Sequence, residues 1–123
     1  MIFAKRLYLI AGIYGLIVLV PQYSMEAKTG QDFPPAVTHP EFYYGFVGVA
    51  VAWQVLFLIL AKDPLRYRPM MIPAILEKAA FGLPVLVLYL QHRVSTFLLC
   101  FGTVDLILGV LFVVAYTQTK ARN

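Results

Sequence analysis

The residues of this sequence that are best suited to chemistry are charged side chains set within long apolar runs. The segment "MIPAILEKAAFGLPVLVLYL", residues 71–90, carries Glu77 and Lys78, and the segment "FGTVDLILG" carries Asp105. A charge in hydrocarbon is costly, and it is retained where it pairs with another group, lines a polar cavity, or handles a proton or cation. These three positions are therefore the leading candidates for a functional site.

Four apolar runs hold or surround these residues, and they predict four helices over residues 7–23, 42–61, 70–90 and 94–117. Each run is close to the roughly 20 residues that a helix needs to cross a bilayer. The chain is 61% hydrophobic and 13% charged, whereas soluble domains are about a quarter charged. We therefore expect an all-α fold, with a single transmembrane domain over residues 1–123 built as a four-helix bundle.

The first run has two interpretations. Lys5 and Arg6, followed by an apolar stretch up to Val20, are also compatible with a secretory signal peptide. No small-residue cleavage pattern follows in "PQYSMEAKTG", so we expect this segment to be a helix of the bundle. Residues 24–41 contain three prolines and no periodicity, which predicts an irregular outer loop.

The basic residues indicate how the helices are oriented. One side has Lys5, Arg6, Lys62, Arg66, Arg68, Lys120 and Arg122, and the other side has Lys28 and Arg93. Cytoplasmic loops carry the excess of lysine and arginine in membrane proteins, so both termini are expected in the cytoplasm. The net charge of +4 is explained by this topology, and we expect no nucleic-acid partner.

Positions along the predicted helices place several polar residues at similar depths. With a rise of about 1.5 Å per residue, Gln54 lies about 18 Å and Asp105 about 16 Å from the same edge of the bilayer. Tyr14 lies about 10 Å from the opposite edge, near the level of Glu77. We therefore predict one buried polar cluster, joined by a Lys78–Asp105 ion pair or a Glu77–Tyr14 hydrogen bond. Its members are Tyr14, Gln54, Glu77, Lys78 and Asp105.

A simpler arrangement is the preferred interpretation for the charges of the third helix, and the cluster is the alternative hypothesis. If this helix begins at Pro73, a residue suited to a first turn, Glu77 lies near the positive helix N-terminus. Lys78 can then extend to the headgroups at the inner surface. Adjacent residues point about 100° apart on a helix, so we do not expect Glu77 and Lys78 to pair with each other.

The two histidines are expected at the outer face. His39 precedes Glu41 in "HPEFYYG", and His92 lies in the short connection "QHR". Together the three side chains are candidates for an outer proton-handling or metal site, although an isolated histidine at an interface is more often solvated. No P-loop, GxSxG or HExxH motif occurs, and Cys100 has no partner for an internal disulfide. We therefore assign no catalytic residue, metal or cofactor.

Three segments resemble those of a known group of proteins. "HPEFYYGFVGVAVAWQ", "DPLRYRPMMIPAILEK" and "FGTVDLILG" are similar in layout to segments of uncharacterised small bacterial membrane proteins with four transmembrane helices, broadly DoxX-like. The resemblance covers most of the chain after the first helix, and it implies a location in the bacterial cytoplasmic (inner) membrane. Some DoxX-type proteins are accessory subunits of quinone-linked oxidoreductases, so it also implies an accessory role, without carrying over a catalytic residue.

Three functions fit these observations. The first is a non-catalytic accessory or assembly subunit of a larger membrane complex, with other membrane subunits as partners; self-association is the alternative to such partners. The second is a small proton- or cation-coupled transporter acting as an oligomer, with Asp105 or Glu77 as the ion-binding carboxylate. The third is a lipid- or quinone-binding protein or isomerase, in which Trp53 and Gln54 join these carboxylates around an apolar ligand. The accessory role is preferred because no complete catalytic set is present.

Overall fold

The computed structural model is all-helical and describes residues 2–119. Its elements are α1 (Ile2–Leu19), the 3₁₀ turn η1 (Val20–Ser24), α2 (Glu26–Asp32), α3 (Pro40–Lys62), the 3₁₀ turn η2 (Arg68–Met70), α4 (Met71–Leu90) and α5 (Thr96–Gln118). Four segments are long and apolar enough to cross a membrane: Ile2–Ser24, Pro40–Lys62, Arg68–Leu90 and Thr96–Gln118. The prediction of an all-α fold with four such helices is confirmed.

The first helix begins earlier than predicted. α1 starts at Ile2 rather than at Leu7, so Lys5 and Arg6 lie within it as exposed residues. An apolar run shows only which part of a helix can lie in the hydrocarbon of a bilayer. Lysine and arginine are good helix formers, so the helix extends beyond the apolar run. The buried residues of α1 include Tyr8, and this helix is therefore part of the packed core.

The prediction of an irregular loop over residues 24–41 is wrong in its first part, where the chain forms α2. The segment "EAKTGQD" has Glu26 in its first turn and an ion pair of 3.2 Å between Lys28 and Asp32, one helical turn apart. An acidic residue at the N-terminus and an ion pair at this spacing both favour a helix. Pro34 and Pro35 lack the backbone N–H groups that a continued helix would need, and the segment up to His39 is irregular as predicted, whereas Pro40 and Glu41 belong to α3 rather than to the loop.

The starts of the last two long helices have local causes. α5 begins at Thr96 rather than at Val94, because the Ser95 hydroxyl caps it by accepting a hydrogen bond of 3.2 Å from the Leu98 amide. Serine is among the preferred residues at this position. α4 begins at Met71, directly after η2, which agrees with a start near residue 70 and leaves Glu77 beyond the first turn.

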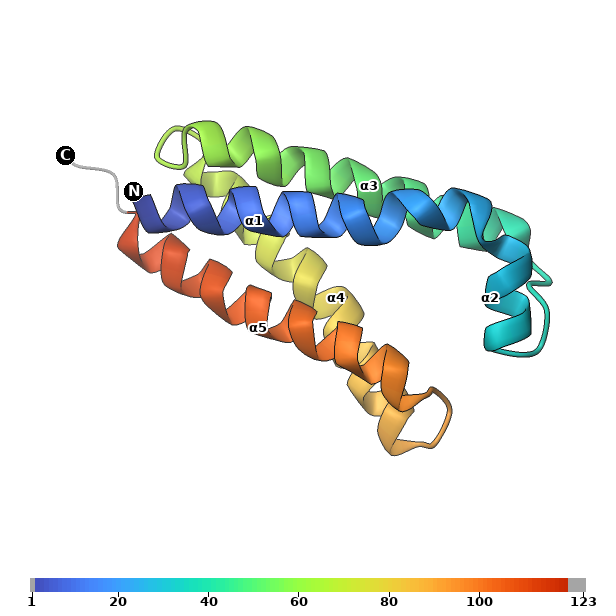
Figure 1. Cartoon of the computed structure of the whole chain (residues 1–123). Coiled ribbons are helices and arrows are strands. Elements are labelled where there is room, and N and C mark those ends of the chain that lie inside the picture. Colours follow the sequence, from blue (N-terminus) through green and yellow to red (C-terminus); the bar gives the residue numbers. More distant parts are fainter. Residues whose placement is uncertain (1, 120–123) are drawn as a thin grey trace.

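The long helices form two antiparallel pairs. α1 packs along α3 and α4 packs along α5, whereas contacts between the pairs are few, including those between the consecutive helices α3 and α4. The pairs meet at the end that holds the N-terminus and the α3–α4 connection, and they spread apart toward α2 and the α4–α5 turn (Figure 1). The short connection makes α3 and α4 neighbours near the ends that it joins, and farther along Phe46 of α3 stacks on Phe81 of α4 with ring centroids 6.0 Å apart.

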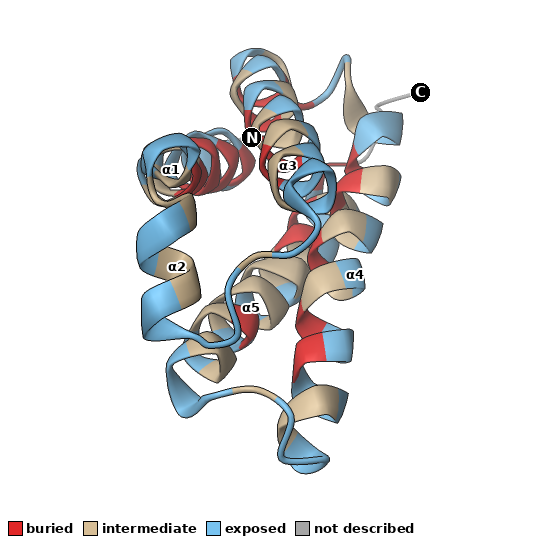
Figure 2. Ribbon diagram, turned by 90° about the vertical axis from the view of Figure 1, so that its right-hand side faces the viewer, coloured by how far each residue is buried: buried red, intermediate tan, exposed pale blue. Residues whose placement is uncertain are grey.

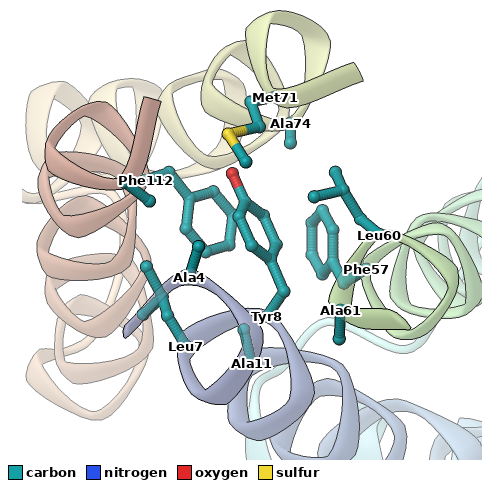
Figure 3. Packing of buried hydrophobic residues seen from close by; sticks show 11 residues of the cluster. Ala4, Leu7, Tyr8, Ala11, Phe57, Leu60, Ala61, Met71, Ala74 and Phe112 are labelled. Atoms are coloured by element: carbon teal, nitrogen blue, oxygen red, sulfur yellow. The ribbon is translucent and has the colours of Figure 1, made fainter. Parts of the chain in front are cut away.

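The core lies where the two pairs meet. Tyr8 of α1 stacks on Phe112 of α5 with ring centroids 4.3 Å apart, and Phe57 of α3 lies 6.0 Å and 5.2 Å from these two rings. Met71 and Ala74 of α4 belong to the same cluster (Figure 3). Elsewhere the outer faces of the helices carry mostly exposed or half-buried side chains (Figure 2). All four long helices thus share one core near one end of the molecule.

Glycines set the spacing within each helix pair. A Cβ atom added at Gly12 of α1 would lie 3.0 Å from the backbone oxygen of Gln54 in α3, and one added at Gly82 of α4 would lie 3.0 Å from the backbone oxygen of Gly102 in α5. Small residues of this kind let helix backbones approach closely. At Gly45 an added Cβ would have no neighbour within 4 Å, so this glycine has no such role.

Candidate functional site

Among residues 2–119, Lys78 is the one charged residue that is buried, with 3% of its side chain exposed. It shares a face of α4 with Ala74, Gly82 and Val85, at spacings of three and four residues, and α4 packs mainly against α5. A Cβ added at Gly109 of α5 would lie 3.3 Å from the Cβ of Lys78. The face of α4 that packs closely is therefore the face that carries the lysine.

Two carboxylates flank the Lys78 ammonium group. Its Nζ donates a hydrogen bond to Asp105 Oδ1 at 3.4 Å and lies 3.6 Å from Glu77 Oε2. The ring centroid of Phe57, in α3, is 5.1 Å from the same nitrogen, within the range of a cation–π interaction. One cation is thus shared by two anions and faces an aromatic ring, so contacts from three helices meet at this point. We call Glu77, Lys78 and Asp105 the Lys78 cluster.

The predicted Lys78–Asp105 ion pair is confirmed, and two other expectations for this region are wrong. Lys78 does not extend to a surface, because its aliphatic chain packs against α5 and its ammonium group binds Asp105. Glu77 does approach Lys78, because flexible side chains can bend toward each other even where the Cα–Cβ directions diverge. Their separation of 3.6 Å makes an ion pair but is too long for a hydrogen bond.

The charges of the Lys78 cluster do not cancel. The side chains of Glu77 and Asp105 are 17% and 16% exposed, so both carboxylates are largely shielded from solvent. Glu77 Oε2 is buried and has no hydrogen-bond partner. Lys78 can neutralise one carboxylate, and the second can accommodate a proton or a further cation. The arrangement is therefore able to hold α4 against α5, and it has one carboxylate in excess.

Gln54 and Tyr14 are not hydrogen-bonded to the Lys78 cluster. Gln54 is buried against Gly15 of α1, and its Nε2 donates to the Ala50 carbonyl oxygen at 2.9 Å, within its own helix. Tyr14 is half-buried in α1, and the expected hydrogen bond from Tyr14 to Glu77 is not formed within residues 2–119. The structure thus brings together three of the five predicted residues by direct contacts.

The outer-face candidates form a pair rather than a three-residue site. His39 Nδ1 lies 3.2 Å from Glu41 Oε1, and both side chains are exposed at the start of α3. His92 lies in the α4–α5 turn with a positive φ of 60°. In the described part of the chain no three His, Cys, Asp or Glu side chains are grouped closely enough to hold a metal. His92 therefore does not join His39 and Glu41 in a metal site.

A buried tyrosine in α1 was not predicted from the sequence. Tyr8 has no exposed surface, and its hydroxyl, which points toward Met71 in Figure 3, has no hydrogen-bond partner. The signal for it was present, because Ala4, Tyr8 and Ala11 follow one another at spacings of four and three residues on the face that continues to Gly12. The small residues on this face indicate close packing on both sides of the tyrosine.

Arg68 has a structural role that its charge alone did not indicate. Its Nε and Nη2 atoms donate hydrogen bonds of 3.2 Å and 3.1 Å to the Tyr116 carbonyl oxygen, and its guanidinium carbon lies 3.8 Å from the centroid of the Tyr116 ring. These contacts attach η2 to the C-terminal end of α5. In the sequence nothing distinguishes Arg68 from the neighbouring Arg66, whose side chain is exposed.

Comparison with known proteins gives no match for this chain. No protein-family model matches it, and neither a curated protein nor a solved structure matches it.

Proposed function

We propose that this chain is an integral membrane protein whose four long helices all cross the bilayer. The length and apolar composition of these helices support the proposal. Exposed apolar side chains such as Ile17, Val49, Leu83 and Val110 point away from the chain on all four helices, which suits a lipid surrounding better than water. The resemblance to DoxX-like proteins favours the bacterial inner membrane.

Both termini lie in the cytoplasm in this proposal. The α3–α4 connection with Arg66 lies at the same end of the molecule as the N-terminal turn with Lys5 and Arg6 (Figure 1). A concentration of basic residues at one end is typical of the cytoplasmic side. Lys120 and Arg122, which entered the same prediction, lie outside the described residues.

Within the membrane, we propose a non-catalytic accessory or assembly role as a subunit bound to larger membrane proteins. The observation that carries this proposal is the uncovered surface of α5. In its most apolar stretch 11% of the residues are buried within the chain, against 39% in the first helix. The exposed face of α5 is a continuous stripe of side chains at spacings of three and four residues: Thr103, Ile107, Val110, Val113 and Thr117.

The composition of this α5 stripe favours a protein partner. All five side chains are branched at Cβ and therefore have few rotamers to lose on binding. The hydroxyls of Thr103 and Thr117 donate to backbone carbonyl oxygens of α5 itself, so they can be covered without leaving an unpaired donor. Helices in membranes associate through close packing rather than a hydrophobic force, and a rigid, even surface suits this packing.

The Lys78 cluster fits a structural role in such a subunit. Lys78 is paired inside the chain with Asp105 and Glu77, and so α4 and α5 are held together whether or not a partner is bound. A polar contact between helices in a membrane stabilises their association. No residue of the cluster is assigned a catalytic role.

Native mass spectrometry after gentle extraction from the native membrane tests the accessory role. We expect the 13.8 kDa chain to be recovered in complexes with larger subunits. Val110→Trp should weaken this association because it disrupts the α5 stripe. Val49→Trp in α3 is the matched control, because both valines are 63% exposed, and it should leave the complex intact. Recovery of the chain as a monomer or a small homo-oligomer, or equal loss with both variants, would contradict the proposal.

A small proton- or cation-coupled transporter acting as an oligomer is the second candidate. It is favoured by the two carboxylates beside one lysine and by the buried Glu77 Oε2, which accepts no hydrogen bond, since carboxylates at membrane depth often bind protons or ions. The purified chain in vesicles would then move protons or cations, and the combination of Glu77→Gln and Asp105→Asn would abolish the movement. Transport that persists in the double variant excludes this mechanism.

A further inference from the structure

An apolar groove lies along α3 near its C-terminal end. It has a volume of about 380 Å³, and its lining includes Ala52, Val55, Leu56, Ile59, Tyr67 and Met70. The first four of these residues lie on one face of α3, at spacings of three and four, and the last two come from the α3–α4 connection and η2. Val55, Ile59 and Met70 are exposed, so side chains of this chain do not fill the groove.

Basic side chains stand at one end of the groove. Lys62 is exposed and follows Ile59 on α3 by three residues, so it continues the lining face. The guanidinium carbon of Arg66 lies 5.4 Å from the centroid of the Tyr67 ring, which lines the groove. Asp63 is the acidic residue between them, and its Oδ1 accepts a hydrogen bond of 3.2 Å from the Arg66 amide. Two cations against one anion leave this end positive.

The two basic side chains at the groove are also free to bind a ligand. Arg68, by comparison, uses its Nε and Nη2 atoms for the Tyr116 carbonyl oxygen and stacks on the Tyr116 ring. Neither Lys62 nor the side chain of Arg66 has a hydrogen bond or salt bridge to another residue within residues 2–119. A groove with an apolar length and a cationic end is complementary to an amphipathic anion.

We propose that this groove binds an anionic phospholipid of the bilayer. One acyl chain lies against Val55 and Ile59, and the phosphate group lies between Lys62 and Arg66. Long basic side chains at the end of a membrane helix reach the headgroup layer, and basic pockets on the cytoplasmic side bind anionic headgroups. The inference rests on the proposed membrane crossing and does not depend on the accessory role.

Trp53 provides the measurement, because it is the single tryptophan of the chain and is adjacent to Ala52. The full chain is placed in phosphatidylcholine vesicles with increasing mole fractions of phosphatidylglycerol that carries brominated acyl chains, which quench tryptophan fluorescence on contact. Brominated phosphatidylcholine is titrated separately. We expect the anionic lipid to reach half-maximal quenching at a lower mole fraction, and each basic side chain should contribute about fivefold to this preference.

Paired variants separate a specific site from general attraction. Lys62→Gln combined with Arg66→Gln should abolish the preference for the anionic lipid. Lys28→Gln combined with Arg93→Gln removes the same charge at the opposite end and should preserve it. Equal quenching by both lipids in the parent chain, or equal effects of the two double variants, would overturn the site while leaving the membrane crossing intact. Absence of quenching by either lipid would overturn the lipid site but not the membrane crossing, because Trp53 is half-buried and packs partly against the core.

Discussion

Lys78 is the residue on which the charge balance between α4 and α5 depends. Its ammonium group lies within 4 Å of two carboxylates, and all three side chains are mostly shielded from solvent. Removing one partner of a buried ion pair leaves an uncompensated charge, and the typical cost is about 3–5 kcal/mol. Loss of Lys78 leaves two such charges, whereas loss of Asp105 leaves Lys78 paired with Glu77. The three residues should therefore differ in their effects on stability.

Replacement of Lys78 by methionine keeps the length of the side chain and removes its charge. We expect Lys78→Met to lower the free energy of unfolding by about 3 kcal/mol, measured in detergent by denaturant titration followed by far-UV circular dichroism. Asp105→Asn should lower it less. Adding Glu77→Gln and Asp105→Asn to Lys78→Met restores neutrality and should recover most of the loss. An unchanged stability of Lys78→Met, or no recovery in the triple variant, would show that the cluster does not hold the helices.

At the residue scale, the sequence predicts how deep a residue lies along its helix, but not the direction in which its side chain points. The pairing of Lys78 with Asp105 was predictable because position along a helix axis increases linearly with residue number. The contact of Glu77 with Lys78 depends on side-chain rotamers, which residue spacing does not determine. Gln54 lies at a depth similar to that of Asp105, but it packs against Gly15 of α1. Such contacts depend on the rotation of each helix about its axis, and the depth of a residue does not determine this rotation.

At the scale of elements, glycines keep the members of each helix pair close together. Gly12 approaches the backbone of α3, and Gly82 approaches the backbone of α5, whereas Gly45 has open space beside it. Extra atoms in a well-packed interface force shifts that typically cost about 1–3 kcal/mol. In contrast, alanine is favoured over glycine within a helix by about 1 kcal/mol. Where the space is open, the helix preference should decide the outcome.

The same substitution should thus have opposite effects at two glycines. We expect Gly12→Ala to destabilise the chain by about 1–2 kcal/mol and Gly45→Ala to stabilise it slightly, both measured by the same unfolding titration. The two variants add the same methyl group to long helices of one antiparallel pair, so each is the control for the other. Similar changes in stability, of either sign, would contradict the close approach of α1 and α3 at Gly12.

The existence of the long helices could be predicted, and their ends less well. The length of an apolar run identifies a segment that can cross a membrane, but the first and last residues of a helix are set by helix-forming residues and capping side chains nearby. Lys5 and Arg6 extend α1 beyond its apolar run, and the Ser95 hydroxyl fixes the start of α5. α2 was missed because it lies in a polar segment and is supported by an ion pair between Lys28 and Asp32. The prolines that follow this segment favoured its interpretation as a loop.

At the scale of the whole molecule, the two helix pairs share their buried core at one end, and single aromatic contacts such as Phe33–Phe97 bridge them elsewhere. The contacts of Tyr8 with Phe57 and Phe112, and those of Arg68 with Tyr116, lie where the pairs meet (Figures 1 and 3). This pairing could not be predicted, because the helices are apolar on nearly all sides. In such helices hydrophobic periodicity does not separate a face toward lipid from a face toward another helix. Small residues in the sequence predict that a helix packs closely against another helix, but they do not identify which helix that is.

The position of the connections leads to a prediction about topology. α2 lies at the end of the molecule opposite the α3–α4 connection (Figure 1), so the two should be on opposite sides of the membrane. In a background with Cys100→Ser, we expect a membrane-impermeant maleimide to label Gln31→Cys in intact cells. Leu65→Cys should be labelled only after the membrane is disrupted, because the basic residues around it mark the cytoplasmic side.

Both replaced side chains are exposed, so a difference in labelling reports the side of the membrane rather than burial. Labelling of both positions from outside would contradict the four crossings, and labelling of Leu65→Cys alone would reverse the proposed orientation.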